Sequence, residues 1–435
     1  MGIGNFHRAH QAWYTEVADT DREWGIAAFT GRQPDIALEL GPQGGLYTLI
    51  ERGPQSDQAS IVSSIVDVQD GANIGRLVEV MSRTETALVT LTVTEAGYRL
   101  DADGGLNRDD VELTSDIDRI ATNLAADEPG PASQPTTVLG RLVLGLAARQ
   151  RRGSGPVSIV CCDNIPSNGE VLRRAVSTLA GWVEEDLARW IESEVDFVST
   201  VVDRITPAAT VADREIASEL IGARDVSPVV TEPFSEWILS GEFRAGRPQW
   251  EAAGARFVTD IEPYERRKLW LLNGAHTILA HFGLQRGLTT VAEAIGDQEG
   301  FRRVDEFWNA ACRHLPEDLD LGQYRADILE RFRNPRIEHL LSQIARDSAT
   351  KLRYRVAPVA RAELRDGRAD RSCALAFATW MRLVLDGYRA PGPVDPDLEI
   401  AVESADPSEA LLRLVDGELA DSQEFDDAVR RARQA

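Results

Sequence analysis

Cysteine is scarce in this sequence, and long apolar runs are absent. The four cysteines are Cys161, Cys162, Cys312 and Cys373, and none of them has CxxC spacing. This argues against a disulfide framework and against a zinc site, so we expect no bound metal. Apolar runs such as "ALVTLTV" at 87–93 are much shorter than the roughly 18 residues that a membrane span needs. The start "MGIGNFHRAH" lacks the basic and apolar build of a signal peptide, which predicts a cytoplasmic protein.

Basic residues are also few. Lys and Arg total 47 against 70 Asp and Glu, which gives a formal net charge of -23, and no dense basic tract offsets it. We therefore expect neither nucleic acid nor an anionic membrane as a partner. The hydrophobic share of 43% and the charged share of 27% are those of an ordinary globular protein, and 435 residues are enough for two or three domains.

The order of the sequence patterns predicts an α/β fold class. Helical periodicity, as at 137–152, alternates in the first half with short β-branched runs, which is typical of a doubly wound parallel sheet. From about residue 205 the pattern becomes mainly helical. We expect an α/β domain at 1–195 and a mainly α-helical substrate and catalytic domain at 196–435. The strand candidates are 24–30, 87–94 and 157–162.

A pair of glycines opens the sequence. In "GIGNFH", Gly2 and Gly4 have the spacing of a tight turn that brings backbone N–H groups close to a pyrophosphate at a helix N-terminus. His7 stands where the GxGxxG pattern has its third glycine. Taken alone, two glycines near a terminus are more often a flexible start than a nucleotide site.

The residues around these glycines resemble a known family. The stretch "GIGNFHRAHQAWYT" is similar to the GxGxFHRAHQAxYT opening of the long-chain polyol-specific dehydrogenases, the mannitol dehydrogenase family with its fructuronate reductase-like members. The resemblance implies a metal-independent oxidoreductase with a Rossmann-like NAD(P)-binding domain and a helical catalytic domain. Further blocks match in the family's order along almost the whole chain: "GLYTL" at 45–49, "VTLTVTEAGY" at 89–98, "CDNIPSNG" at 162–169, "VDRITP" at 202–207, "VVTEPFSEW" at 229–237 and "YERRKLWLLNGAH" at 264–276.

The last of these blocks predicts a helix with one polar side. At about 100° per residue, Glu265, Asn273 and His276 all fall within about 140° of Lys268. Burying an unpaired lysine or histidine costs several kcal/mol, so a buried polar side indicates a site. The alternative is a solvated run of charges beginning at Glu265. The flanking "LWLL" argues against it, because apolar residues on the other sides leave little of the helix for water.

In the resembled family this KxxxxNxxH helix is the catalytic element, and its spacing is intact here. The resemblance implies that Lys268 takes the hydroxyl proton while hydride leaves for the nicotinamide. A lysine can do so only if desolvation or a neighbouring cation lowers its pKa from about 10.4. Asn273 and Asn164 are implied as two amide donors to the substrate oxygen, which is oxyanion-hole chemistry. His276 would orient substrate hydroxyls, and Glu265 would gate proton exchange with solvent.

Asn164 and Asp203 each have a plainer interpretation. For Asn164 it is a turn residue that caps the following helix. Asp203 is carried over from "VDRITP" as a substrate-binding residue, and its plainer interpretation is an ion pair with Arg204 or another neighbour.

A basic segment is the other candidate for substrate binding. "RDSATKLRYR" resembles the family's DGSxKxPxR segment, so Lys351 and Arg355 are implied as substrate anchors. Ser348, Ala349 and Arg353 depart from the pattern, which affects the shape of the loop. A cationic pair there suits a uronate carboxylate, a sugar phosphate or polyol hydroxyls.

The cofactor is expected to be NAD, with NADP left open. In dinucleotide folds an acid after the second strand binds the ribose diol, whereas an arginine there can accept the phosphate of NADP. Here "FTGRQPD" offers Arg32 first and Asp35 later, and the family mostly prefers NAD. The cofactor-binding residues that the resemblance implies are Gly2, Gly4, Phe6, His7, Arg32, Thr94 and Glu95.

The family has its first strand immediately before the glycine turn, and the chain starts at Met1. We expect that the start lies downstream of the true one or that the product is defective, and the undamaged motifs favour the first explanation. The expected function is interconversion of a polyol or aldonate with its ketose, of the mannitol/fructose or mannonate/fructuronate type. The alternatives are a mannitol-1-phosphate 5-dehydrogenase-like activity and a non-catalytic nucleotide-binding regulator. We expect a monomer or homodimer that binds a small polyol, sugar acid or ketose.

Overall fold

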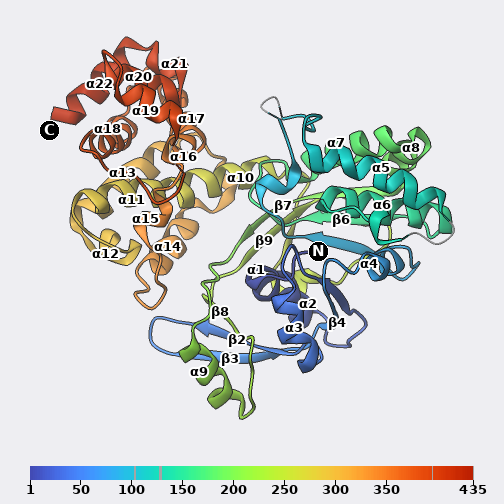
Figure 1. Ribbon diagram of the computed structural model, residues 1–435. Coiled ribbons are helices and arrows are strands. Elements are labelled where there is room, and N and C mark those ends of the chain that lie inside the picture. Colours follow the sequence, from blue (N-terminus) through green and yellow to red (C-terminus); the bar gives the residue numbers. More distant parts are fainter. Residues whose placement is uncertain (102–103, 127–129, 394, 435) are drawn as a thin grey trace. The chain divides into compact units, whose positions relative to one another are not determined.

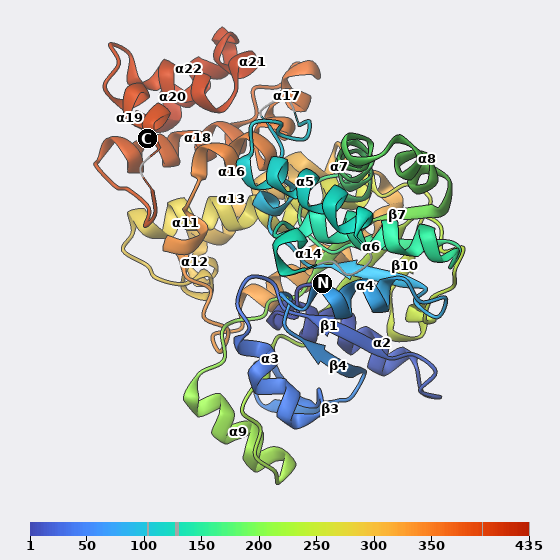
Figure 2. The same cartoon turned by 45° about the vertical axis from the view of Figure 1, so that its right-hand side comes forward.

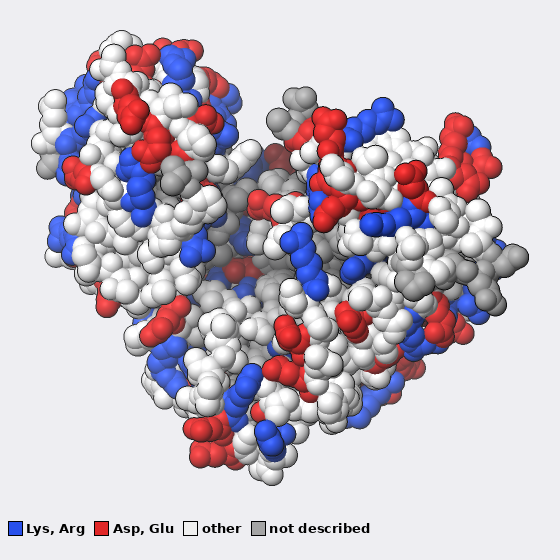
Figure 3. Space-filling view, viewed as in Figure 1, with Lys and Arg blue, Asp and Glu red and all other residues white. Residues whose placement is uncertain are grey.

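The computed structural model describes residues 1–101, 104–126, 130–393 and 395–434. The chain divides into two compact units, Met1–Glu262 and Pro263–Ala435 (Figure 1). The first unit combines sheets with helices, whereas the described part of the second is mainly helical (Figure 2). On the face drawn in Figure 3, acidic and basic side chains are interspersed. Among the described residues, no helix combines the length and the apolar character of a membrane span.

The main sheet of the first unit has five strands in the order β10-β9-β7-β6-β5. Strands β5 (Leu88–Leu91), β6 (Val157–Cys161) and β7 (Val195–Asp203) run parallel. All of β6 is buried, which explains its continuous apolar sequence. Strand β9 (Glu236–Ser240) is antiparallel to β7, and β10 (Arg256–Phe257) pairs with β9. The helices that connect the parallel strands lie on one face of this sheet (Figure 1): α5 (Val111–Ala125), α6 (Val138–Arg152), α7 (Asn168–Val183) and α8 (Glu185–Glu194).

Two smaller sheets complete the first unit. Strands β1 (Ile26–Phe29) and β4 (Ile65–Gln69) form a parallel pair. The other sheet has the order β3-β2-β8, with a β2–β3 hairpin and β8 parallel to β2. Its strands are β2 (Tyr47–Arg52), β3 (Asp57–Val62) and β8 (Val229–Thr231), and α9 (Val211–Ile221) packs against β2 and β3.

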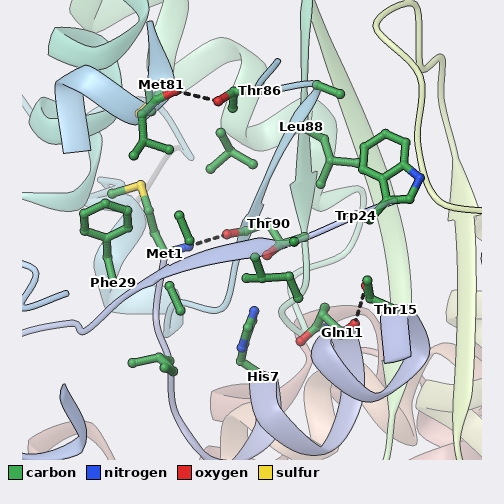
Figure 4. Close-up of a pocket in the computed structure, with 18 of the residues that line it drawn as sticks. Met1, His7, Gln11, Thr15, Trp24, Phe29, Met81, Thr86, Leu88 and Thr90 are labelled. Atoms are coloured by element: carbon green, nitrogen blue, oxygen red, sulfur yellow. Dashed lines mark hydrogen bonds between the residues drawn. The ribbon is translucent and has the colours of Figure 1, made fainter. Parts of the chain in front are cut away.

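Met1 and Gly2 lie between β1 and β5. The Met1 amine donates to Thr90 O at 2.6 Å and Met1 O accepts from Thr92 N at 3.1 Å, which is the bonding pattern of a parallel strand pair. Gly2 N donates to Phe29 O at the end of β1. A cavity of ≈ 170 Å³ adjoins these residues and is lined by β1 and β5 (Figure 4). Met1 and Gly2 therefore connect the carboxyl ends of β1 and β5 by hydrogen bonds, and the cavity lies between these two strands.

The second unit is organised around one buried helical run. It begins with α10 (Glu262–Arg267), continues through a π-helical segment, η6 (Lys268–Gly274), and ends with α11 (Ala275–Gln285). Ala275–Gly283 are all buried. The helices that surround this run are α12 (Val291–Gly296), α13 (Gln298–Cys312), α14 (Leu321–Phe332), α15 (Leu341–Ile344), α16 (Ser348–Arg355), α17 (Ala357–Arg365), α18 (Arg371–Leu385), α19 (Pro396–Val402), α20 (Pro407–Val415), α21 (Gly417–Ala420) and α22 (Gln423–Gln434).

The remaining helical elements are short. The chain starts with a helical run that has a π-helical centre, made of α1, η1 and α2. The bounds are α1 (Asn5–His7), η1 (Arg8–Ala12), α2 (Trp13–Ala18), α3 (Asp35–Leu40) and α4 (Ile74–Met81), with 3₁₀ turns η2 (Gly41–Gln43), η3 (Glu95–Tyr98), η4 (Pro131–Ser133), η5 (Trp250–Ala253) and η7 (Glu317–Leu319).

The fold class predicted from the sequence is confirmed, and the position of the division needs correction. The three strand candidates correspond to β1, β5 and β6, and the predicted helix to α6. The first domain was expected to end at residue 195, whereas the compact unit continues to Glu262. The reason is that β7 pairs with β6, β8 with β2 and β9 with β7, so these strands belong to the sheets of the first unit. The expectation of a mainly helical pattern from about 205 is therefore wrong for β8, β9 and β10.

Candidate active site

The glycine turn has the backbone geometry of a close approach. Gly2 has φ +99°, and a Cβ on it would lie 2.5 Å from Thr92 Oγ1, so only glycine fits there. A Cβ on Gly4 would meet nothing within 4 Å. Gly4 is exposed and immediately precedes the helical run that starts at Asn5. Gly2 thus packs the turn against the end of β5, and Gly4 leaves open space beside a helix start, as the pyrophosphate of a dinucleotide requires.

His7 and Gln11 face the cavity between β1 and β5 (Figure 4). Both are buried, and His7 Nδ1 and Gln11 Oε1 lack a hydrogen-bond partner. Burial lowers the pKa of His7 to about 3, so its ring is neutral. Phe6 stacks on the ring of His10 with 5.0 Å between centroids. The helical run after the glycines therefore presents uncharged polar atoms to this cavity.

The other residues predicted in the first unit follow strands. Arg32 is exposed after β1, Thr94 and Glu95 are exposed after β5, and Asn164 is exposed after β6. Asp203 is the buried last residue of β7. Strands β5, β6 and β7 are parallel, and Met1–Gly2 bonds to the carboxyl ends of both β1 and β5. The residues that follow or end these strands therefore lie at the same edge of the sheet, where the carboxyl ends of the strands meet. That edge is where an open parallel sheet binds its ligand.

The turn that carries Asn164 is held by residues that the sequence analysis did not single out. Tyr98 donates a hydrogen bond to Asp163, whose pKa is raised by burial. Asn168 is fully buried, and its amide bonds to Cys161 O at 3.3 Å and to Thr200 N at 2.9 Å. These bonds tie the turn to the end of β6 and to Thr200 within β7. The only sequence signal was their place inside the "CDNIPSNG" block.

Arg204, one of the neighbours named as an ion-pair partner for Asp203, forms an ion pair with Glu51. The Arg204 guanidinium is buried. It also lies 4.4 Å from the centre of the Trp13 ring.

The predicted catalytic helix contains a π-helical turn at Lys268–Gly274. The angles expected for a regular α-helix are therefore wrong across this segment. In a π-helix the backbone hydrogen bonds join residues five apart, so Asn273 lies about one turn after Lys268 on the same side. In an α-helix the same two residues would be about 140° apart. Glu265 lies buried in the α-helical turn before them.

His276 is buried, and its Nε2 lacks a hydrogen-bond partner. Its ring contacts those of Phe332 and His339, at centroid distances of 4.4 and 4.6 Å. Burial lowers the pKa of His276 well below its ordinary value, and the charges of His339, Arg331, Arg355 and Lys351 lower it further. His276 is thus a neutral ring surrounded by basic groups, of which the sequence analysis missed Arg331.

Lys351 and Arg355 make hydrogen bonds to backbone carbonyl groups within the second unit. Lys351 Nζ donates to Ile344 O at 2.9 Å, and Arg355 NH1 donates to Asn273 O at 3.3 Å. Arg355 therefore contacts the π-helical turn directly.

Ser348, which departs from the family's pattern, contacts a histidine of the second unit. The Ser348 hydroxyl lies 2.8 Å from His281 Nε2 and donates to Ala345 O. Burial lowers the pKa of His281 to about 3, so this histidine is neutral as well.

The two units thus gather different parts of the predicted set. The first unit brings the glycine turn, Thr94, Glu95, Asn164 and Asp203 to the carboxyl edge of its parallel strands. The second brings Lys268, Asn273, His276, Lys351 and Arg355 to the π-helical turn and α16. Pairing of Asn164 with Asn273 joins residues of both units and stays a prediction.

A parallel sheet with a glycine turn at its carboxyl edge, followed by a helical domain with a lysine, an amide and a buried histidine, suits a dehydrogenase. Residues 1–252 match the mannitol dehydrogenase Rossmann domain, and residues 260–434 match the mannitol dehydrogenase C-terminal domain. The chain belongs to the mannitol dehydrogenase family and is an oxidoreductase of the polyol dehydrogenase class.

Relatives and solved structures agree with this assignment. The chain is 35% identical over 394 residues to D-mannonate oxidoreductase of Escherichia coli, covering 88% of this chain and 78% of the relative. It is 33% identical over 392 residues to mannitol 2-dehydrogenase of Cereibacter sphaeroides, covering 88% and 79%. The mannitol 2-dehydrogenase of Pseudomonas fluorescens in ternary complex with NAD and D-mannitol has a TM-score of 0.81 at 30% identity, covering 100% of this chain and 90% of that one. A substrate-free D-sorbitol dehydrogenase has a TM-score of 0.89 at 27% identity, covering 100% and 91%.

Proposed function

We propose that the protein interconverts a sugar acid or polyol with the corresponding ketose, with NAD as the hydride carrier and Lys268 as the acid and base. One observation carries most weight. The π-helical turn puts Lys268 and Asn273 on one side of a helix that continues into His276, a buried neutral ring whose Nε2 lacks a hydrogen-bond partner.

The use of basic residues in the chain supports a chemical role for Lys268. Of the 47 Lys and Arg residues only Lys268 and Lys351 are lysines, and both lie in the second unit. An arginine stays protonated in proteins and cannot accept a proton, whereas a lysine can. Lysine is thus kept at two positions in a chain that uses arginine everywhere else.

The proposed chemistry moves one proton and one hydride. In oxidation the substrate hydroxyl gives its proton to Lys268 Nζ while hydride leaves the carbon that bears this hydroxyl. A nicotinamide dinucleotide held at the glycine turn, Thr94 and Glu95 would supply the hydride acceptor. The Asn273 amide donates to the oxygen on which negative charge develops, and the His276 ring orients the neighbouring hydroxyls. In reduction Lys268 returns the proton to the carbonyl oxygen.

Basic groups around His276 favour a substrate with a carboxylate. Arg331 and Lys351 are among the charges that lower the pKa of His276 further after burial. Partly buried cations bind a carboxylate by charge-assisted hydrogen bonds, whereas a neutral polyol offers them only hydroxyls. We therefore place an aldonate and its keto acid, of the mannonate/fructuronate type, before mannitol and fructose.

The residues of the first unit fit a dinucleotide. Gly2 and Gly4 allow the close approach, and Thr94 and Glu95 lie at the same sheet edge. We propose NAD, and Arg32 is the residue that would allow NADP, because it is exposed where the ribose phosphate is expected. Replacement of Arg32 by glutamine is expected to weaken NADPH binding and to leave NADH binding within about twofold.

The test is a substrate panel. The purified protein is mixed with aldonates, polyols, keto acids and ketoses and with each nicotinamide cofactor, with and without EDTA, and absorbance at the nicotinamide band is followed. We expect activity with a sugar-acid pair that survives EDTA. Arg331→Gln should raise KM for the sugar acid by about tenfold and leave KM for a neutral polyol unchanged. Tight NADH binding without turnover of any pair would instead favour a nucleotide-binding regulator.

A further inference from the structure

The π-helical turn at Lys268–Gly274 is contacted by side chains from two other helices. Wide turns of this kind are rare and short, because the extra residue disturbs the regular ladder of backbone hydrogen bonds. Here Leu271 O accepts a hydrogen bond from Trp308 Nε1 at 2.8 Å, and Asn273 O accepts one from Arg355 NH1 at 3.3 Å. Both carbonyl groups belong to the turn, and both donors come from outside it.

Trp308 reaches the turn from α13. Its side chain is fully buried, and a buried indole N–H needs an acceptor, which Leu271 O provides. The neighbouring Phe307 packs so closely on the turn that a Cβ on Gly274 would lie 2.7 Å from its ring. Helix α13 therefore fixes one side of the turn by close packing and by a hydrogen bond.

Arg355 reaches the turn from α16. Besides Asn273 O, its guanidinium donates to Thr277 Oγ1 at 3.1 Å. The Thr277 hydroxyl in turn donates to Asn273 O at 3.0 Å. Arg355 thus joins the last part of the π-helical turn to the first turn of α11.

We infer that Trp308 and Arg355 are positioning residues that hold the π-helical turn open, so that Lys268 and Asn273 stay on one side of the helix. The inference rests on the proposed function for its catalytic meaning. It gives Arg355 a role in shaping the site, in place of direct contact with the substrate.

The geometry gives the consequence of losing these bonds. If the turn relaxes to an α-helix, Asn273 rotates away from Lys268 until the two residues are about 140° apart around the helix. Asn273 then leaves the side of the helix that carries Lys268. A misplacement of this kind is expected to lower kcat, because the reacting groups are no longer aligned, while substrate binding changes less.

Matched substitutions test this inference. Trp308→Phe removes the indole donor and keeps an aromatic ring, and Arg355→Gln removes the guanidinium, whereas Arg355→Lys keeps a cationic donor. Trp380→Phe is the control for loss of a buried indole in the same unit. Arg353→Gln is the control on α16, because Arg353 bonds to Leu414 O and Val415 O, away from the turn.

The first measurement is amide hydrogen exchange over residues 268–277 in the cofactor-free protein. The second is the separate determination of kcat and KM. We expect faster exchange and a kcat lowered by about 100-fold in Trp308→Phe and Arg355→Gln, partial recovery in Arg355→Lys, and wild-type behaviour in both controls.

Two results overturn the inference. One is exchange at wild-type rates in both Trp308→Phe and Arg355→Gln. The other is an Arg355→Gln variant with raised KM and unchanged kcat and exchange, which would make Arg355 a direct substrate ligand. If Trp308→Phe does not fold, the Arg355 pair decides. A wild-type protein without activity counts against the proposed function, whereas the exchange comparison still decides this inference.

Discussion

Replacement of Asn168 by alanine tests how the turn that carries Asn164 is held. The Asn168 side chain is fully buried at the start of α7. Its Oδ1 accepts from Thr200 N at 2.9 Å, and its Nδ2 donates to Thr200 O at 3.2 Å and to Cys161 O at 3.3 Å. One amide thus joins the end of β6 and the middle of β7 to the start of α7.

The magnitude follows from the groups that alanine leaves behind. The buried Thr200 N–H loses its acceptor, which costs about 1–3 kcal/mol. Loss of the bonds that the amide donates adds about 1 kcal/mol. Cys161 O keeps the Thr200 hydroxyl as a donor, so it adds no further penalty. We therefore expect the free energy of unfolding of the first unit to fall by about 2–4 kcal/mol.

Equilibrium urea unfolding measures this difference. Asn123→Ala is the control, because Asn123 makes only long bonds of 3.4 Å to Ser133 in the described structure, and it should stay within about 0.5 kcal/mol of the wild type. The kcat of Asn168→Ala should fall as well, since Asn164 loses its support. A loss of unfolding free energy below about 1 kcal/mol would show that the Asn168 amide does not hold this turn, because a single unsatisfied buried N–H already costs that much.

Two further predictions concern other parts of the chain. Gly2→Ala should lower the melting temperature because its Cβ would collide with Thr92, whereas Gly4→Ala should fold normally and bind NADH less tightly, as thermal unfolding and fluorescence titration will show. His281 has a pKa lowered from 6.5 to about 3, so it is neutral when folded and takes up a proton on unfolding below pH 6.5. The free energy of unfolding of the wild type should therefore decrease as the pH is lowered from 6.5 towards 3. The decrease should be steeper than in His281→Gln by about 1.4 kcal/mol per pH unit, and parallel curves in urea unfolding would contradict this.

Much of the fold could be predicted because its signals are local. Strands β1, β5 and β6 are short β-branched runs, and α6 has a clear helical period. The division between the units was missed because β8 and β10 are too short to stand out, with three and two residues. Their place in the sheets depends on pairing with distant strands, which the local sequence does not encode.

The site was predictable in residue types and less so in geometry. The KxxxxNxxH spacing identified Lys268, Asn273 and His276, yet the helix was expected to be regular. A π-helical turn leaves no signal in composition or period, because it depends on donors such as Trp308 that lie far away in sequence. Asn168 was overlooked for a similar reason, since its role becomes visible only when β7 lies beside β6.

The most direct test of the account is the rate of the Lys268→Arg variant, measured by nicotinamide absorbance with the best substrate pair. Arginine keeps the positive charge and cannot exchange the proton. We expect kcat to fall by about 10²–10⁴-fold, as in Lys268→Ala, while NADH binding is unchanged. A variant that keeps its rate within a few-fold of the wild type would show that Lys268 acts through charge alone, and would contradict its role as acid and base.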